Sequence, residues 1–327
     1  MLEEPGSVPP AVLTATYKSR RLNIDEFIDW EDETEMDPLH IELPNLETRL
    51  TARIDTLIMM GITISNIDGT GETDTQNIRM PSATANVFDG GVSGRLDWEV
   101  TRPDYYNIHF VGDIDDVRAE AFFKEFQMGM PGNFHNHITG GFTANADYRA
   151  GMTDMMEQDT PTIVADGSFS MNRARLRDHP MQVSIANLLN SSELRDMSLD
   201  DMTADFSISD GIMTLTDLNL TSLDIGMTMN GTQKMIEDEL DFKLQLRLPE
   251  RYSDRIASLI SADAVNALKG DDGILVLPLV VVGTSENPRV TVDRDVVQRI
   301  ITDYLRQQGS ERVEDAVRGI IRGIQRN

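Results

Sequence analysis

The chain has 327 residues, a formal net charge of −26 and no cysteine, and this length suits one large or two ordinary domains, each with its own core. The acidic balance argues against a nucleic-acid partner, because phosphate backbones select for clustered Lys and Arg. The absence of cysteine excludes a disulfide framework, a Cys-ligated zinc site and a Cys nucleophile, and no apolar run is long enough to cross a membrane as a helix.

The N-terminal part, residues 1–46, is predicted to be a partly disordered acidic linker or edge segment. It contains Pro5, Pro9 and Pro10 and the acidic run 29–35, and such runs are solvated and self-repelling. The first residues are acidic and lack the basic and apolar regions of a signal peptide. The protein is therefore either cytoplasmic or the downstream part of something longer.

Residues 47–292 are dominated by an alternation of apolar and polar residues and are predicted to form one β domain. Every second residue of 242–248 is Phe or Leu, and every second residue of 225–229 is Ile or Met. Strict alternation places the apolar side chains on one face of a sheet. Tight hairpins need the backbone angles that Asp-Gly and Asn-Gly supply. The turns predicted from such pairs, and from one Asn-Pro pair, are 68–69, 89–91, 166–167, 210–211, 230–231 and 287–288. The pattern predicts a long antiparallel meander.

Helical spacing of apolar residues is confined to a few segments. The short helices predicted from it are 115–126, 181–189 and 252–268. After residue 293 the helical period takes over, so 293–327 is predicted to be a C-terminal helical segment. Its two apolar stripes are 296–305 and 313–324.

The last helix of this segment is predicted to carry a basic face made of Arg318, Arg322 and Arg326. A basic amphipathic end on an acidic protein is typical of a helix that docks on a membrane surface or on a partner. The alternative is a helix that simply packs on the sheet.

A series of strand motifs recurs in the second half of the chain. The stretch 199–215 reads LDDMTADFSISDGIMTL, which is a strand, an Asp-Gly turn and a second strand. Further strands follow at 223–231 and 239–244, and 277–290 reads LPLVVVGTSENPRV. In order and spacing these motifs resemble the AsmA-like C-terminal region of envelope proteins from Gram-negative bacteria. Upstream, 21–27 reads RLNIDEF and is followed by an acidic linker, which resembles the start of the same module in its Bacteroidota-type members. The resemblance covers about residues 20–295.

This resemblance implies a mainly β fold, with a long curved antiparallel sheet forming a taco-like groove, a few short helices and C-terminal amphipathic helices. Family members are tied to outer-membrane biogenesis and to phospholipid movement between the two membranes. The residues fit this independently, because a sheet with one apolar face must cover it with helices, a second sheet or acyl chains. From alternation alone, the alternative is an ordinary sandwich core. The residues predicted to line the lipid groove are Leu215, Leu218, Leu220, Ile225, Met227, Met229, Phe242, Leu244, Leu246, Val280 and Val282.

The sequence therefore predicts a non-enzymatic protein without cofactor, which binds phospholipid and takes part in lipid transport. Its further partners are predicted to be the membrane surface, through the C-terminal helix, and an envelope protein. The alternative is a structural or assembly factor for the outer membrane, with a closed core and a protein partner. Carbohydrate binding is disfavoured, because the chain has only two Trp for sugar stacking.

The expected location is the periplasm or cell envelope. Family members begin with a transmembrane helix and further β repeats, and this chain has neither. It is therefore expected to be the C-terminal part of a longer protein or a split version of one. Its anchor in the inner membrane would then belong to an N-terminal part absent from this chain.

Metal binding has little support in the sequence. His135 and His137 form an H-x-H pair, but a metal site needs further ligands, for which only His109 and His179 are available. A surface loop is favoured for this pair, since a Pro-Gly-Asn run precedes it. No catalytic residue is predicted.

Overall fold

The computed structural model describes residues 11–27, 46–74, 76–102, 105–126, 133–153, 157–260, 262–270 and 272–307. The contacts of the chain divide it into two compact units. Unit 1 comprises Met1–Arg118, Phe142–Gly167 and Ile208–Gly211, and unit 2 comprises Ala119–Gly141, Ser168–Ser207 and Ile212–Asn327.

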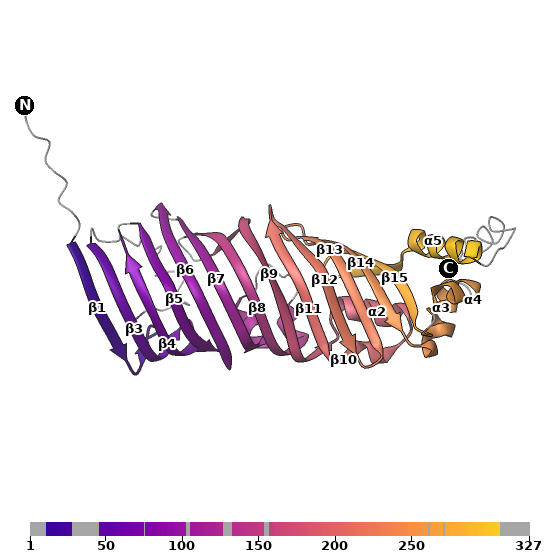
Figure 1. Ribbon diagram of the computed structural model, residues 1–327, viewed down its shortest axis with the longest axis horizontal. Coiled ribbons are helices and arrows are strands. Elements are labelled where there is room, and N and C mark those ends of the chain that lie inside the picture. The colour runs from indigo at the N-terminus through magenta and orange to yellow at the C-terminus, as the bar shows by residue number, and fades with distance from the viewer. Residues whose placement is uncertain are drawn as a thin grey trace, which may run out of the picture. The chain divides into compact units, whose positions relative to one another are not determined.

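Unit 1 is built from strands (Figure 1). They are β1 (Ala11–Ser19), β2 (Leu22–Asn23), β3 (Leu46–Met59), β4 (Ile62–Thr73), β5 (Asn77–Val87), β6 (Gly90–Arg102), β7 (Tyr105–Arg118), most of β8 (Ile138–Thr153) and half of β9 (Gln158–Arg177). Among its described residues, unit 1 contributes no helix.

Unit 2 contains both strands and helices. Its strands are the remainders of β8 and β9, β10 (Asp196–Leu199), most of β11 (Asp201–Ser209), β12 (Ile212–Ser222), β13 (Ile225–Lys234), β14 (Glu239–Leu248), β15 (Leu275–Gly283) and β16 (Pro288–Val292). Its helices are α1 (Ala119–Glu125), α2 (Pro180–Leu188), α3 (Ser253–Leu259), α4 (Ala262–Leu268) and α5 (Arg294–Gln307), with short 3₁₀ turns η1 (Phe134–Asn136), η2 (Ser192–Arg195) and η3 (Glu250–Tyr252).

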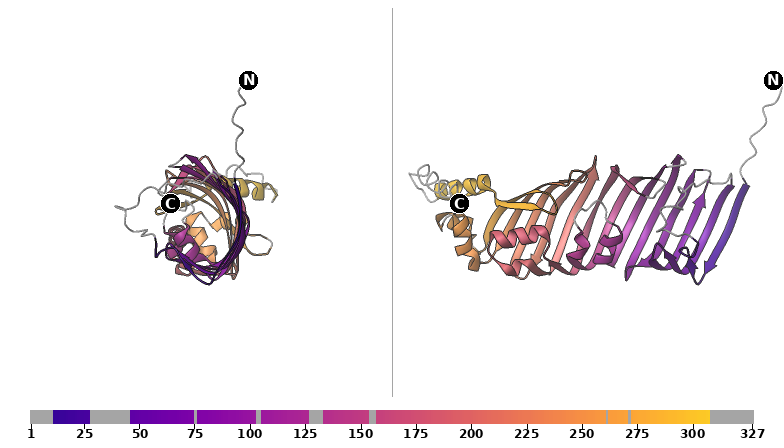
Figure 2. Two further views of the ribbon diagram at one scale, coloured as in Figure 1. Left: turned by 90° about the vertical axis from the view of Figure 1, so that its left-hand side faces the viewer. Right: turned by 180° about the vertical axis from the view of Figure 1, so that it is seen from behind.

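The predicted fold class is confirmed at the level of secondary structure and pairing. The described strands follow the order β1-β3-β4-β5-β6-β7-β8-β9-β11-β12-β13-β14-β15-β16, in which neighbours are hydrogen-bonded. From β3 onward the registered pairs of the two units are antiparallel, and the sheet of each unit is curved (Figure 2). The fold is therefore mainly β, with a few short helices.

Strand β1 departs from the meander, because it pairs with β3 in parallel from Ala11↔Leu46 to Ser19↔Ile54. A parallel pair needs a long connection that returns the chain to the starting end of the strand. Residues 20–45 supply that length, and their β2 also pairs with β3 in parallel. Within the segment predicted to be a linker or edge, residues 11–19 thus form an edge strand.

Three of the six predicted turns are wrong, because Gly69, Gly167 and Gly231 lie inside β4, β9 and β13. A Cβ atom on Gly231 would lie 2.2 Å from the carbonyl oxygen of Asp241, and one on Gly167 would lie 2.1 Å from that of Asn145. In these strands glycine marks a close approach of neighbouring backbones, not a hairpin. The predicted turns at 89–91, 210–211 and 287–288 do lie at strand ends.

The predicted helices are present with altered bounds. Helix α1 starts later than predicted because β7 continues to Arg118. The segment predicted as one helix at 252–268 is divided into α3 and α4, since Ile260 adopts φ −122° and ψ −60°, outside the helical region. The first apolar stripe of the C-terminal segment forms α5, whose Val297 and Ile301 are buried, and the second stripe lies outside the described residues.

Candidate functional site

The residues predicted to line a groove all lie in unit 2, where the strand register decides which face each occupies. Leu220 lies opposite Met227, Met227 opposite Leu246, and Leu246 opposite Leu277. A parallel row runs from Leu218 through Met229 and Leu244 to Leu279. Opposed residues of neighbouring strands point to the same face, so these side chains share one apolar face.

Val280 and Val282 were assigned to the wrong face. Val280 lies opposite Lys243, and Val282 lies opposite Asp241, so both share a face with charged residues. Val281 is the β15 residue that joins Phe242 on the apolar face, and it is completely buried. Strand β15 is apolar on both faces, so its own sequence carries no alternation that could fix the orientation.

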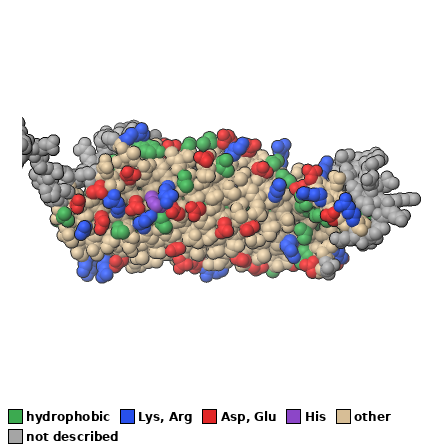
Figure 3. Space-filling model, turned by 45° about the horizontal axis from the view of Figure 1, so that its top comes forward, with side chains coloured by type: hydrophobic (Ala, Val, Ile, Leu, Met, Phe, Trp, Pro, Cys, Tyr) green, Lys and Arg blue, Asp and Glu red, His purple; other side chains and the backbone are tan. Residues whose placement is uncertain are grey.

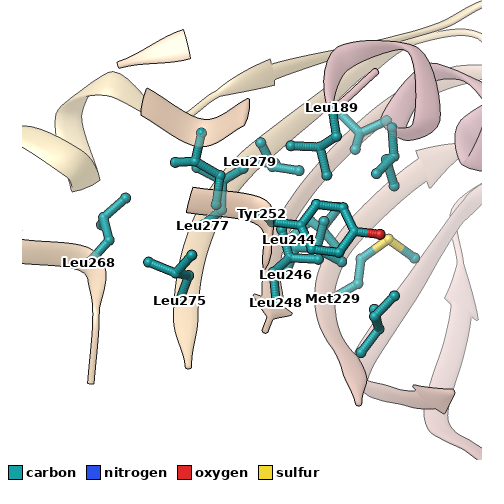
Figure 4. Packing of buried hydrophobic residues seen from close by; sticks show 14 of the residues in the cluster. Leu189, Met229, Leu244, Leu246, Leu248, Tyr252, Leu268, Leu275, Leu277 and Leu279 are labelled. Atoms are coloured by element: carbon teal, nitrogen blue, oxygen red, sulfur yellow. The ribbon is translucent and has the colours of Figure 1, made fainter. Parts of the chain in front are cut away.

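In unit 2 this apolar face is a packed core. Leu244 exposes only 1% of its surface, and Leu218 only 3%. Tyr252 of η3, Leu189 at the end of α2 and Leu268 of α4 belong to the same buried cluster as these strand residues (Figure 4). The helices of this unit therefore seal the face on which an open groove was predicted.

A small cavity remains beside this core. It has a volume of about 60 Å³ and is lined mainly by apolar side chains, with His179 and Gln182 as the polar members. Gln182 is buried and donates to the carbonyl of Leu176. Four of the residues predicted to line the groove, Leu220, Ile225, Met227 and Leu246, contribute to the lining of this cavity.

His179 is expected to make unit 2 sensitive to acid. Burial, followed by the neighbouring His137, lowers the pKa of His179 from 6.5 to about 4. A depressed pKa means that the unfolded chain binds the proton more readily, so stability is full above pH 6.5 and falls as the pH drops toward 4. One pKa unit corresponds to about 1.4 kcal/mol, so the loss is at most about 3 kcal/mol.

Urea unfolding of wild type and of His179→Leu at several pH values measures this contribution. The free energy of unfolding of wild type should fall more steeply below pH 6.5 than that of the variant. His135→Leu serves as the matched control for the loss of an imidazole. Parallel curves for wild type and His179→Leu would contradict the assignment.

Over β3 to β6 of unit 1 the corresponding face is apolar and only partly buried, whereas Tyr106 on β7 and Phe142 and Met152 on β8 are buried. Ile54 lies opposite Ile67, and Met80, Leu96 and Phe110 form one row across β5, β6 and β7. These side chains are only partly buried. The described residues between 11 and 102 contribute no buried hydrophobic side chain at all.

The opposite face of the same strands is polar. Arg53 pairs with Asp68 at 2.7 Å across β3 and β4. The imidazole Nε2 of His109 lies 2.9 Å from the carboxylate Oδ1 of Asp147, across β7 and β8. Charged side chains are scattered over the face in view in Figure 3. Unit 1 therefore has one charged face and one face of partly exposed hydrocarbon.

The apolar face of unit 1 extends to its edge strand. Leu13 lies beside Thr48, and Tyr17 lies beside Ala52, which puts both on the face of Leu50 and Ile54. Leu13 is 50% exposed, Tyr17 39% and Leu50 37%. We define the open apolar face by these positions and by the others that the register places with them: Leu13, Tyr17, Leu50, Ile54, Ile67, Ile78, Met80, Leu96, Trp98, Ile108 and Phe110. The prediction of groove residues missed this face, although its strands alternate in the same way.

The other predicted site residues are separated from this face or lie outside the described residues. Arg318, Arg322 and Arg326 lie outside them. His135 belongs to the turn η1, and His137 follows it, with its ring 5.6 Å from that of His179. Within the described chain, no three His, Asp or Glu side chains come together as a metal site would require.

Comparison with protein-family models, with curated proteins and with solved structures finds no match. None of the described helices combines the length and the apolar content needed to cross a bilayer.

Proposed function

We propose that this is a non-enzymatic, AsmA-like protein of the cell envelope, which binds phospholipid acyl chains and contributes to lipid transport between membranes and to outer-membrane biogenesis. One observation carries the proposal. The open apolar face of unit 1 stays partly exposed, whereas the equivalent face of unit 2 is packed under its own helices. The binding surface is therefore assigned to unit 1, away from the predicted groove residues.

The energetics of exposed hydrocarbon support this assignment. Fully burying a Leu, Ile or Phe side chain gains about 1.5–3 kcal/mol, and partly exposed side chains retain a fraction of that gain. An extended acyl chain that covers several such residues gains the sum of these burial free energies. Binding of this kind needs only a continuous apolar surface. It requires neither a catalytic residue nor a specific polar contact that fixes the ligand.

Mass spectrometry of the purified protein and uptake of a fluorescent phospholipid test the proposal. Co-purified phospholipid and saturable uptake are the expected results. A lipid-free preparation that also fails to take up the fluorescent phospholipid would reject it.

A second candidate is a structural or assembly factor for the outer membrane with a protein partner. The observation that favours it is the packed, helix-covered core of unit 2, beside which lies the small cavity. The lipid experiments separate the two, because an assembly factor with a closed core would take up no phospholipid.

Docking on a membrane through the C-terminal segment remains a prediction from its sequence. Replacing Arg318, Arg322 and Arg326 together by Glu is expected to weaken binding to anionic vesicles. Each basic residue near such a surface contributes about 1 kcal/mol, so the three reversals should cost at least a factor of ~100 at low salt. Sedimentation with liposomes that contain phosphatidylserine measures this, and neutral liposomes are the control. Unchanged sedimentation would favour a helix that packs on the protein.

A further inference from the structure

Among the described residues of unit 1, three side-chain polar atoms are buried without a hydrogen-bond partner: the amide oxygen of Asn23 on β2, the indole Nε1 of Trp98 on β6 and the phenol oxygen of Tyr148 on β8. The last two are hydrogen-bond donors on long strands of the sheet. Leaving a buried donor unsatisfied is unfavourable, and such groups in native proteins call for an explanation. Burial also raises the pKa of Tyr148 to about 12, so its hydroxyl keeps its proton and remains a donor at neutral pH.

The strand register places both side chains on the open apolar face. Trp98 lies opposite Ile78 on one side and Ile108 on the other. On the polar face His109 contacts Asp147, and a Cβ atom on Gly151 would lie 1.8 Å from the hydroxyl oxygen of Tyr105. Both contacts fit an antiparallel register of β7 and β8 in which Ile108 lies opposite Tyr148. Trp98 and Tyr148 therefore belong to one row, two strands apart, which corresponds to about 10 Å between their backbones.

The surroundings of this row are apolar. Its members are Ile78, Trp98, Ile108 and Tyr148, and the next row contains Tyr106, whose ring packs edge-on against Trp98 at 5.7 Å. The charged residues of these strands, such as Arg79 and Arg149, alternate onto the other face. Among the described residues of this row there is no cation that would compensate the desolvation of a charged acceptor. A neutral hydrogen-bond acceptor attached to hydrocarbon would pair with the two donors and would also fit the apolar surroundings.

We propose that Trp98 and Tyr148 donate hydrogen bonds to the ester carbonyl oxygens of a glycerolipid whose acyl chains lie on the open apolar face. This inference rests on the proposed function and adds a chemical preference to it. Neither atom is open to bulk water. A ligand oxygen must therefore insert between the side chains of the face to reach them. The ester group of a lipid that lies on this face is placed to do so.

The test compares two phosphatidylcholines with the same chain length, one with ester-linked and one with ether-linked chains. Only the ester lipid carries carbonyl acceptors. One hydrogen bond contributes about 1 kcal/mol net, which is roughly a fivefold change in affinity. Wild type is expected to bind the ester lipid about 5- to 25-fold more tightly than the ether lipid.

Trp98→Phe and Tyr148→Phe should each lower this ratio about fivefold. The ratio is the readout because any loss of apolar contact area affects the ester and the ether lipid alike. Tyr17→Phe removes a phenol oxygen from the same face at the edge strand and is the matched control, expected to keep the wild-type ratio. The chain has two Trp, so in a Trp30→Phe background the fluorescence of Trp98 should shift with ester lipid more than with ether lipid.

Wild-type ester-to-ether ratios in both Phe variants would overturn the inference and leave acyl-chain binding intact. Equal affinity of wild type for the two lipids would overturn it as well. Failure of wild type to bind either lipid would instead remove the proposed function and this inference with it.

Discussion

A double variant of the open apolar face, Ile54→Asp with Leu96→Asp, is expected to lose phospholipid uptake by at least a factor of ~10 while remaining folded. An acyl chain laid over this face would bury two unpaired carboxylates, and such burial costs several kcal/mol. In the free protein both positions are partly exposed, so the new carboxylates reach water and the fold tolerates them. Fluorescent-phospholipid uptake measures the loss, and circular dichroism verifies the fold.

The control for this variant adds the same charge on the other face. Thr51→Asp with Asn107→Asp places two carboxylates at exposed positions that alternate away from the apolar face. Uptake by this control should stay within about twofold of wild type, because its added charge is solvated and screened by salt. An equal loss of phospholipid uptake in the two double variants would show that the effect comes from net charge. It would contradict the assignment of lipid binding to the open apolar face.

The fold class was accessible from the sequence because alternation is a local signal. The segment 242–248 alternates strictly, and in β14 every second residue of that segment is buried. Turn prediction succeeded only in part, since Asp210–Gly211 closes a hairpin but Asn230–Gly231 lies within β13. A dipeptide does not reveal whether its glycine supplies a positive φ for a turn or admits a neighbouring backbone.

The location of the open face was not accessible from alternation. Leu96 and Leu244 both occupy apolar positions of alternating strands, yet Leu96 remains partly exposed and Leu244 is sealed. The difference is made by helices that come from other parts of the chain, such as α2 and α4 in unit 2. Coverage of this kind is a tertiary property, which no window of sequence contains.

The polar members of the site were equally hidden. The presence of only two Trp predicts no role for Trp98, and no sequence motif distinguishes Tyr148. Their sequence neighbourhoods do predict the face on which each side chain lies. Their lack of a hydrogen-bond partner depends on what the adjoining strands present, and register between strands is not a local property.

Replacing Leu244 by Ala is expected to destabilise the protein by about 2–5 kcal/mol, because a 1% exposed Leu leaves a cavity that its packed neighbours cannot fill. The same truncation at Leu96 should cost about 1 kcal/mol or less, since that side chain has not been fully removed from water. Urea unfolding followed by circular dichroism measures both. Under conditions where each variant is folded, the order of effects on phospholipid uptake should be reversed, with Leu96→Ala the weaker binder. Equal destabilisation by the two truncations, together with weaker lipid uptake by Leu244→Ala, would return the binding surface to unit 2.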